Sequence, residues 1–221
     1  MPIERMIPLM LDGVKDTLYM TTVSTLFAYL LGLPLAIALV LTAPSGLRPN
    51  SLVYRILDAV VNIFRSIPFL ILMIQVIPVT RLIAGKAYGS TATIVPLVIA
   101  AAPYVARMIE SSLLEVDPGV IEAAQSMGAD IKTIIFKVLI PEAKTSLIVG
   151  ATISSGTILG YSAMSGAIGG GGLGQIAISY GYNRYQTDVL LVTVVLLIIL
   201  MQIIQVIGMR ISRKTDKRIR E

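Results

Sequence analysis

Cysteine and histidine are both absent from this chain of 221 residues. Without thiol and imidazole groups, the sequence argues against disulfides, zinc sites and catalysis by Cys or His. Charge is also scarce, because only 14% of the residues are charged while 55% are hydrophobic, and the mean hydropathy is +0.83. An ordinary soluble domain carries about 25% charged residues. The composition therefore predicts an integral membrane protein in contact with lipid.

A phosphate-binding P-loop of the form G-x-x-x-x-G-K-[ST] is missing as well. Gly85-Lys86 is followed by Ala87 and so does not complete the motif. We therefore expect no ATP hydrolysis by this chain, no other enzymatic chemistry and no cofactor. The net charge of +5 does not indicate nucleic-acid binding, because the basic residues lie in loops and near the C-terminus, beside apolar segments.

Long apolar segments dominate what is present. A membrane-spanning helix needs about 20 apolar residues, and five segments qualify, at about 17–42, 56–80, 87–106, 145–165 and 189–209. The apolar stretch 1–11 is interrupted by Glu4 and Arg5 and is too short to cross, so we expect it to precede the first span. Because no soluble domain fits between the spans, residues 1–221 are expected to form a single transmembrane domain.

The segment between the third and fourth spans, about 111–144, contains two predicted short helices. Asp117 can cap a helix that has Pro118 at its first position, and Gly128 can end it in a left-handed conformation. A second helix is expected from Asp130, with its apolar residues on one face and Pro141 as its limit. Two helices joined by a glycine corner form a compact protrusion that suits docking.

The loop also carries a spaced motif: Glu122-Ala123-Ala124, then Gly128, then Val138-Leu139-Ile140-Pro141. It resembles the E-A-A, G, I-x-L-P pattern of the permease subunits of ABC importers, with Val138 and Ile140 as conservative departures. The resemblance implies a type I importer permease fold and makes this loop a cytoplasmic coupling helix that seats on a separate ATPase. The coupling residues it implies are Glu122, Ala123, Ala124, Gly128 and Pro141. For Glu122, a solvated helix carboxylate remains the alternative.

Orientation can be derived from the basic residues. If the loop is cytoplasmic, five spans place the N-terminus outside and the C-terminus inside, and most basic residues then lie inside, as the positive-inside rule requires. The inside set is Arg48, Arg55, Arg107, Lys132, Lys137, Lys144, Arg210, Arg213, Lys214, Lys217, Arg218 and Arg220.

Arg65 and Pro68 form a further candidate feature, structural or coupling in role. The segment Phe64-Arg65-Ser66-Ile67-Pro68-Phe69 resembles the F-R-x-x-P segment of amino-acid-type ABC permeases. Arg65 is either an arginine that snorkels to the membrane surface or a contact that fixes helix register.

A glycine run follows the fourth span. Tyr161, Met164 and Ser165 stand directly ahead of Gly169 to Gly172. One interpretation is close helix packing followed by a flexible outer loop. The other is an outer gate or translocation path lined by these three side chains, where a methionine thioether suits a closing wall or a sulfur-bearing ligand.

Taken together, these motifs resemble the methionine importer permease family over nearly the whole length. The resemblance implies a homodimer in the bacterial inner membrane, two copies of an ABC ATPase, an external methionine-binding lipoprotein, and alternating access that imports L- or D-methionine.

Two alternatives stay open. The same kind of machine could carry another amino acid or a small solute. A secondary transporter or channel would instead need charged groups near mid-membrane. Asp58, Glu110 and Asp188 are expected at the margins of the spans, which disfavours the second alternative.

Overall fold

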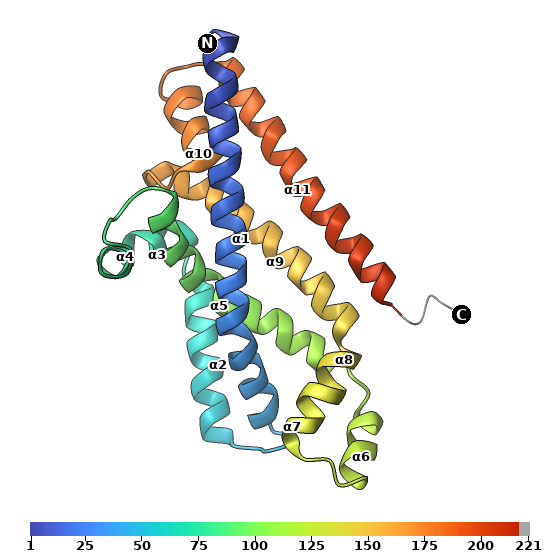
Figure 1. Cartoon of the computed structure of the whole chain (residues 1–221). Coiled ribbons are helices and arrows are strands. Elements are labelled where there is room, and N and C mark those ends of the chain that lie inside the picture. Colours follow the sequence, from blue (N-terminus) through green and yellow to red (C-terminus); the bar gives the residue numbers. More distant parts are fainter. Residues whose placement is uncertain (217–221) are drawn as a thin grey trace. The chain divides into compact units, whose positions relative to one another are not determined.

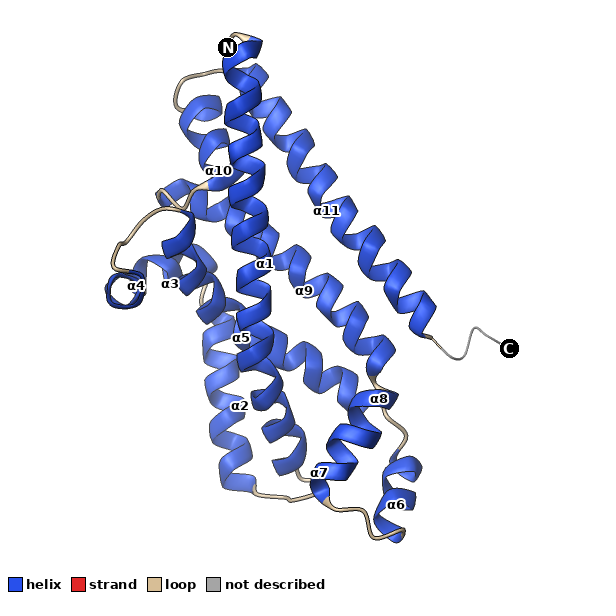
Figure 2. Ribbon diagram, in the orientation of Figure 1, coloured by secondary structure: helices blue, strands red, loops and turns tan. Residues whose placement is uncertain are grey.

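The computed structural model describes residues 1–216, and every regular element in that part of the chain is helical (Figures 1 and 2). The α-helices are α1 (Ile3–Thr42), α2 (Ser51–Ser66), α3 (Phe69–Gln75), α4 (Ile77–Ala84), α5 (Ser90–Leu114), α6 (Pro118–Ser126), α7 (Ile131–Thr133), α8 (Ile140–Glu142), α9 (Lys144–Ser165), α10 (Gly172–Ile176) and α11 (Thr187–Thr215). Two π-helices (Ile134–Leu139 and Ala177–Tyr182) and a 3₁₀ turn (Gly166–Ile168) complete the set. The all-α class is confirmed. Lys217, Arg218 and Arg220 of the predicted basic tail lie outside the described residues.

Four helical segments within residues 1–216 are long and apolar enough to cross a membrane: Ile3–Thr42, Ser90–Leu114, Lys144–Tyr182 and Thr187–Thr215. α2 and α3 pass the same test only as a pair, bent by 103° at their junction. Counting that pair as one span gives five, which agrees with the number expected from the sequence.

The break between α2 and α3 falls at Pro68. A residue that precedes proline is pushed away from the helical region, and Pro68 itself is extended, with φ −57° and ψ 132°. The segment expected at about 56–80 is therefore not one continuous helix, because the chain turns at Pro68 and then continues as α3 and α4.

Helix α1 begins well before the first predicted span. α1 begins at Ile3 and includes residues 3–11, because Glu4 and Arg5 are good helix formers and interrupt only the apolar pattern. Met10, on this added part, is 6% exposed and belongs to a buried cluster with Leu159, Leu173, Ile176, Val189 and Leu200.

Helix α5 likewise continues past the C-terminal end of the third predicted span. We expected it to stop near Ala106, ahead of Arg107, but α5 continues to Leu114. Ile109 and Leu113 extend the buried face past the charged residues, with exposures of 1% and 2%. Arg107 and Glu110 consequently lie within a helix that is long and apolar enough to cross a membrane.

The chain divides into two compact units. Unit 1 comprises Met1–Ala28, Ile67–Ala101 and Ser155–Gln205, and unit 2 comprises Tyr29–Ser66, Ala102–Ser154 and the described residues 206–216. In unit 1, a second buried cluster joins Met20, Phe69, Met73 and Leu97. In unit 2, a Cβ on Gly32 would lie 3.1 Å from the Ala102 carbonyl oxygen, so this glycine lets α1 and α5 approach closely.

Candidate functional site

The loop between α5 and α9, all of it in unit 2, begins with the expected capped helix. The Asp117 carboxylate accepts a hydrogen bond from the Gly119 backbone N–H at 2.7 Å, and Pro118 occupies the first turn of α6. The cap satisfies a donor that the helix cannot satisfy itself, and proline loses nothing there because its missing N–H would be unpaired. The predicted start of this helix is confirmed.

Gly128 forms the corner after α6. Its φ is +77°, and the chain around it makes a Schellman motif: Gly128 N–H donates to Gln125 O at 2.9 Å and Ala129 N–H donates to Ala124 O at 3.1 Å. A Cβ at this position would meet nothing within 4 Å. Glycine is therefore required by the backbone conformation and not by lack of space.

Asp130 caps the next helix and accepts from the Thr133 backbone N–H at 3.0 Å. Hydrogen bonds from the Thr133 side chain and backbone lower the pKa of Asp130 from its ordinary value. The ionised cap thus contributes stability above the ordinary pKa of an aspartate, and that contribution is lost as the pH falls through the lowered value. The cap is present throughout the neutral range.

The second loop helix differs from the prediction. After α7 the chain forms a π-helix over Ile134–Leu139, in which the Ile140 N–H donates to the Ile135 carbonyl, and α8 then runs through Pro141 to Glu142. Proline lacks an N–H and its ring crowds the carbonyl four residues earlier, and the wider turn accommodates both effects. Pro141 therefore does not limit the helix.

The two loop helices leave part of their surface uncovered. Glu122 and Ala123 are exposed, whereas Ala124 is buried at 4% exposure. Ile134, Ile135 and Leu139 are buried as the apolar face predicts, but Ile131 is exposed, and so are Met127 (82%) and Phe136 (62%). Large apolar side chains left exposed on a polar loop are typical of a protein–protein contact surface.

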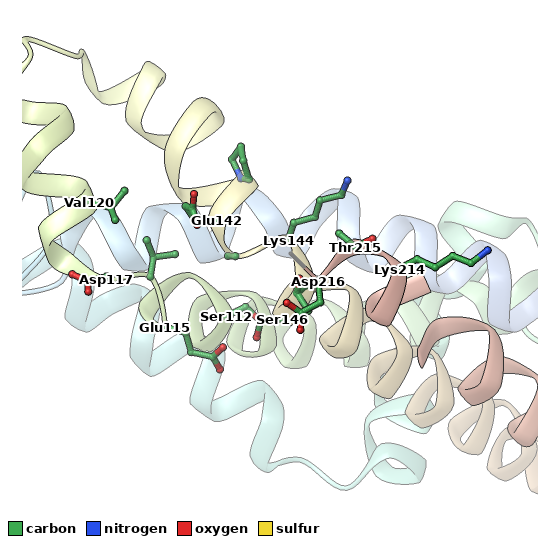
Figure 3. Close-up of a pocket in the computed structure, with 14 residues that line it drawn as sticks. Ser112, Glu115, Asp117, Val120, Glu142, Lys144, Ser146, Lys214, Thr215 and Asp216 are labelled. Carbon is green, nitrogen blue, oxygen red and sulfur yellow. The ribbon is translucent and has the colours of Figure 1, made fainter. Parts of the chain in front are cut away.

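A cavity of about 700 Å³ adjoins this loop within unit 2 (Figure 3). Its walls come from the end of α5, the start of α6, the junction of α8 with α9, and the end of α11. The charged residues that line it are Glu115, Asp117, Glu142, Lys144, Lys214 and Asp216. Among the described residues no group of three or more His, Cys, Asp or Glu is placed to hold a metal ion.

The three candidate gate residues lie in unit 1. The Tyr161 ring stacks on Phe69, with ring centroids 4.6 Å apart and planes 4° from parallel. Met164 is 51% exposed, whereas Ser165 is fully buried and its hydroxyl donates to the Ser162 carbonyl at 2.6 Å. Their role in a translocation path stays a prediction.

The glycine run beside them is a packed turn. Gly169, Gly171 and Gly172 have φ values of +82°, +93° and +69°. Their neighbours fix the turn: Gly89 N–H donates to Gly169 O, the Thr93 hydroxyl donates to Gly170 O, and Leu173 N–H donates to the Thr17 hydroxyl, each at 2.9 Å. The flexible outer loop considered from the sequence is therefore replaced by a structured turn.

Arg65 lies in the last turn of α2, fully on the exposed surface, and Pro68 precedes α3. Their proposed coupling role stays a prediction.

The sequence analysis did not identify a different charged group in unit 2, in which Arg107 contacts Asp58, Asn62 and Glu110. A sequence signal for this group exists, because polar residues three or four positions apart share one helix face. The pairs are Asp58 with Asn62 and Arg107 with Glu110.

The apolar helices, long enough to cross a membrane several times, and the exposed loop between α5 and α9 define the class of a multi-pass helical membrane protein. Comparison with known proteins narrows the class, because residues 28–221 match the model of the family described as "Binding-protein-dependent transport system inner membrane component". The chain belongs to this family, and its fold is that of a type I ABC importer permease.

Individual relatives are similar over most of their length. The chain is 52% identical to the probable D-methionine transport system permease protein MetI of Vibrio cholerae, covering 95% of this chain and 93% of the relative. It is 49% identical to the methionine import system permease protein MetP of Bacillus subtilis, covering 81% of each chain. A solved inward-facing structure of the MetNI methionine ABC transporter matches with a TM-score of 0.95 and 48% identity, covering 97% of this chain and 99% of the other.

Proposed function

We propose that this chain is the permease subunit of an ATP-driven ABC importer that carries methionine into the cytoplasm. The observation that carries the proposal is the 52% identity to a methionine permease over 95% of the chain. The intact coupling loop, with both caps and the Gly128 corner in place, supports it independently. Residues 1–221 act as one transmembrane permease domain.

ATP hydrolysis takes place on a separate subunit in this proposal. The sequence has no P-loop, and the exposed Met127 and Phe136 give the loop an apolar surface for a partner. Two ATPase copies serve a homodimer of this chain, and an external methionine-binding lipoprotein delivers the ligand. The N-terminus lies outside and the C-terminus inside, in keeping with the positive-inside rule.

Transport follows alternating access. ATP binding closes the paired ATPases and moves the coupling loops, and hydrolysis resets them. Such a cycle needs a rigid connection from the loop to the helices, since a nucleotide can drive the change only through different affinities for the two states. The residues that form this connection are Glu122 and Ala123 on the exposed face of α6, Ala124 packed beneath them, Gly128 at the corner and Pro141 at the return to α9.

Co-expression with the ATPase subunit of a methionine ABC importer tests the partner part of the proposal. We expect a detergent-stable complex with two copies of each subunit, measured by native mass spectrometry. A complex that contains a single permease copy would contradict the homodimer. The transported solute is tested separately by uptake.

Met164 is the gate residue best placed for substitution, because half of its side chain is exposed. Replacing it with tryptophan should lower the uptake rate or change the choice between methionine and its larger analogues, while the ATPase still copurifies. Met164→Leu is the matched control, since it keeps apolar volume and should cost under about 1.5 kcal/mol of folding stability. Unchanged uptake kinetics in Met164→Trp would make this residue a packing residue only.

A further inference from the structure

Arg107 is the centre of a charged network between α2 and α5, both parts of which lie in unit 2. One terminal nitrogen of its guanidinium donates to Glu110 at 2.7 Å. The other donates to Asp58 and, at 3.2 Å, to the Asn62 side-chain oxygen. The Asn62 amide in turn donates to the second Asp58 oxygen at 3.1 Å. One arginine therefore ties two residues of α2 to α5.

The network is partly shielded from solvent, with its buried side at Glu110 and its exposed side at Asn62. The Glu110 side chain is 8% exposed, that of Arg107 is 19% exposed and that of Asp58 is 34% exposed. In such surroundings an ion pair fixes the relative positions of its two side chains. Loss of one partner leaves the other charge unpaired where little water can reach it. Two carboxylates share this one guanidinium, so removal of Arg107 leaves both unpaired and close together.

Apolar packing alone does little to hold α2. Of the 16 residues of this helix, only Val61 is fully buried. Its large apolar side chains are instead exposed, including Leu52 (68%), Ile56 (55%) and Ile63 (60%). Asp58 and Asn62, four residues apart, therefore supply the specific attachment of α2 to α5.

The same stretch of α5 leads directly into the coupling loop. From Arg107, helix α5 continues to its end at Leu114, and Asp117, the cap of α6, follows three residues later. On its other side, the buried Ser112 hydroxyl accepts a hydrogen bond from Ser146 of α9 at 3.0 Å. The segment 107–114 is thus anchored to α9, where the loop returns, and through Arg107 to α2.

We propose that Arg107 is a positioning residue that clamps α2 to the loop-bearing end of α5, so that α2 follows the coupling loop when ATP moves it. This inference rests on the proposed function. It also gives Asp58 and Glu110 a role as partners of an arginine and not as binding sites for a coupling ion. Without the clamp, the loop moves while α2 lags, and ATP is hydrolysed without transport.

The test is the ratio of methionine taken up to ATP hydrolysed, measured in proteoliposomes that hold the permease, its ATPase and its binding protein. We expect Arg107→Met to lower this ratio by about tenfold or more, because α2 loses its charged attachment to α5 and the buried Glu110 loses its partner. Arg55→Met is the matched control: it removes an exposed arginine from the same helix as Asp58, three residues before it, and should keep the wild-type ratio.

Two further variants separate coupling from folding. The neutral triple variant Asp58→Asn, Arg107→Met, Glu110→Gln removes every charge together and leaves none unpaired, so it should assemble even where Arg107→Met does not. We expect its ratio to stay low. The reversed pair Asp58→Arg, Arg107→Asp keeps the same set of charges and should restore the ratio to within about threefold of wild type.

A wild-type ratio in either Arg107→Met or the neutral triple variant would overturn the clamp. The wild-type complex, measured in parallel, reports on the proposed function itself. If it moves another solute and not methionine, the proposed cargo is wrong. The clamp is then tested by the ratio of that solute taken up to ATP hydrolysed.

Discussion

Replacing Gly128 with valine is expected to leave the protein in the membrane and to lower ATP-driven uptake by about tenfold or more. The position requires a φ of +77°, which costs a β-branched residue about 1–3 kcal/mol. The Schellman bonds to Gln125 and Ala124 depend on that conformation, so α6 would change its angle to the chain that follows. The measurements are uptake into proteoliposomes and copurification of the ATPase.

Gly128→Asn is the matched control, because asparagine adopts the left-handed conformation more readily than other residues with a side chain. The space around the position is open, since a Cβ added there would meet nothing within 4 Å, so bulk cannot explain a difference between the two variants. We expect the asparagine variant to keep most of the uptake. Equal uptake by the valine variant and the wild-type protein would show that Gly128 is not needed for coupling.

The second large effect is expected at Gly174, in α10. A Cβ there would lie 2.0 Å from the carbonyl oxygen of Ala163 and 2.7 Å from its Cα, and a backbone contact of this kind cannot be relieved by a change of side-chain rotamer. Gly174→Ala should therefore destabilise unit 1 by about 3 kcal/mol or more and lower the thermal unfolding midpoint by roughly 10 °C. The midpoint is measured on the detergent-solubilised protein.

Gly160→Ala is the control for that experiment. It makes the same chemical change in α9, and its added Cβ would meet nothing within 4 Å. We expect an unchanged midpoint or a slight rise, because alanine favours a helix more than glycine does. If Gly174→Ala were as stable as Gly160→Ala, the close packing of α10 against Ala163 at the end of α9 would be wrong.

The coupling loop was predictable because its determinants are local. Asp117, Pro118, Gly128 and Asp130 each act on backbone groups within three or four residues, so a sequence pattern carries the full information. The π-helix before Pro141 was not predictable in the same way. A proline in this position can end a helix or widen it, and the buried Ile134, Ile135 and Leu139 favour continuation because they keep the helix packed.

The Arg107 network escaped prediction because it depends on a contact between distant segments. Charged residues were used to mark the ends of the spans, and this criterion placed Arg107 outside the third span and Asp58 at the margin of the second. Once α5 is seen to extend to Leu114, the two groups meet across 49 positions of sequence. A charged residue at the end of an apolar segment can therefore mark a membrane boundary or form an ion pair with another helix. The two cases are distinguished only when the position of its partner is known.

The role of the proposed gate residues was not predictable from the sequence for a different reason. Tyr161 and Met164 were chosen for their chemistry, and the structure gives Tyr161 a stacking partner in Phe69 and leaves Met164 exposed. A path that forms between two copies of a chain cannot be identified from the contacts within one copy. Substitution at Met164 decides the question more directly than geometry does.

The most direct measurement is uptake of labelled methionine into proteoliposomes that contain this chain with its ATPase and binding protein, with ATP present on the ATPase side or withheld. We predict uptake only with ATP, competed by unlabelled methionine and not by other amino acids. Uptake that is equal without ATP, or ATP-driven uptake of a different solute that methionine does not compete, would contradict the assignment as a methionine importer permease.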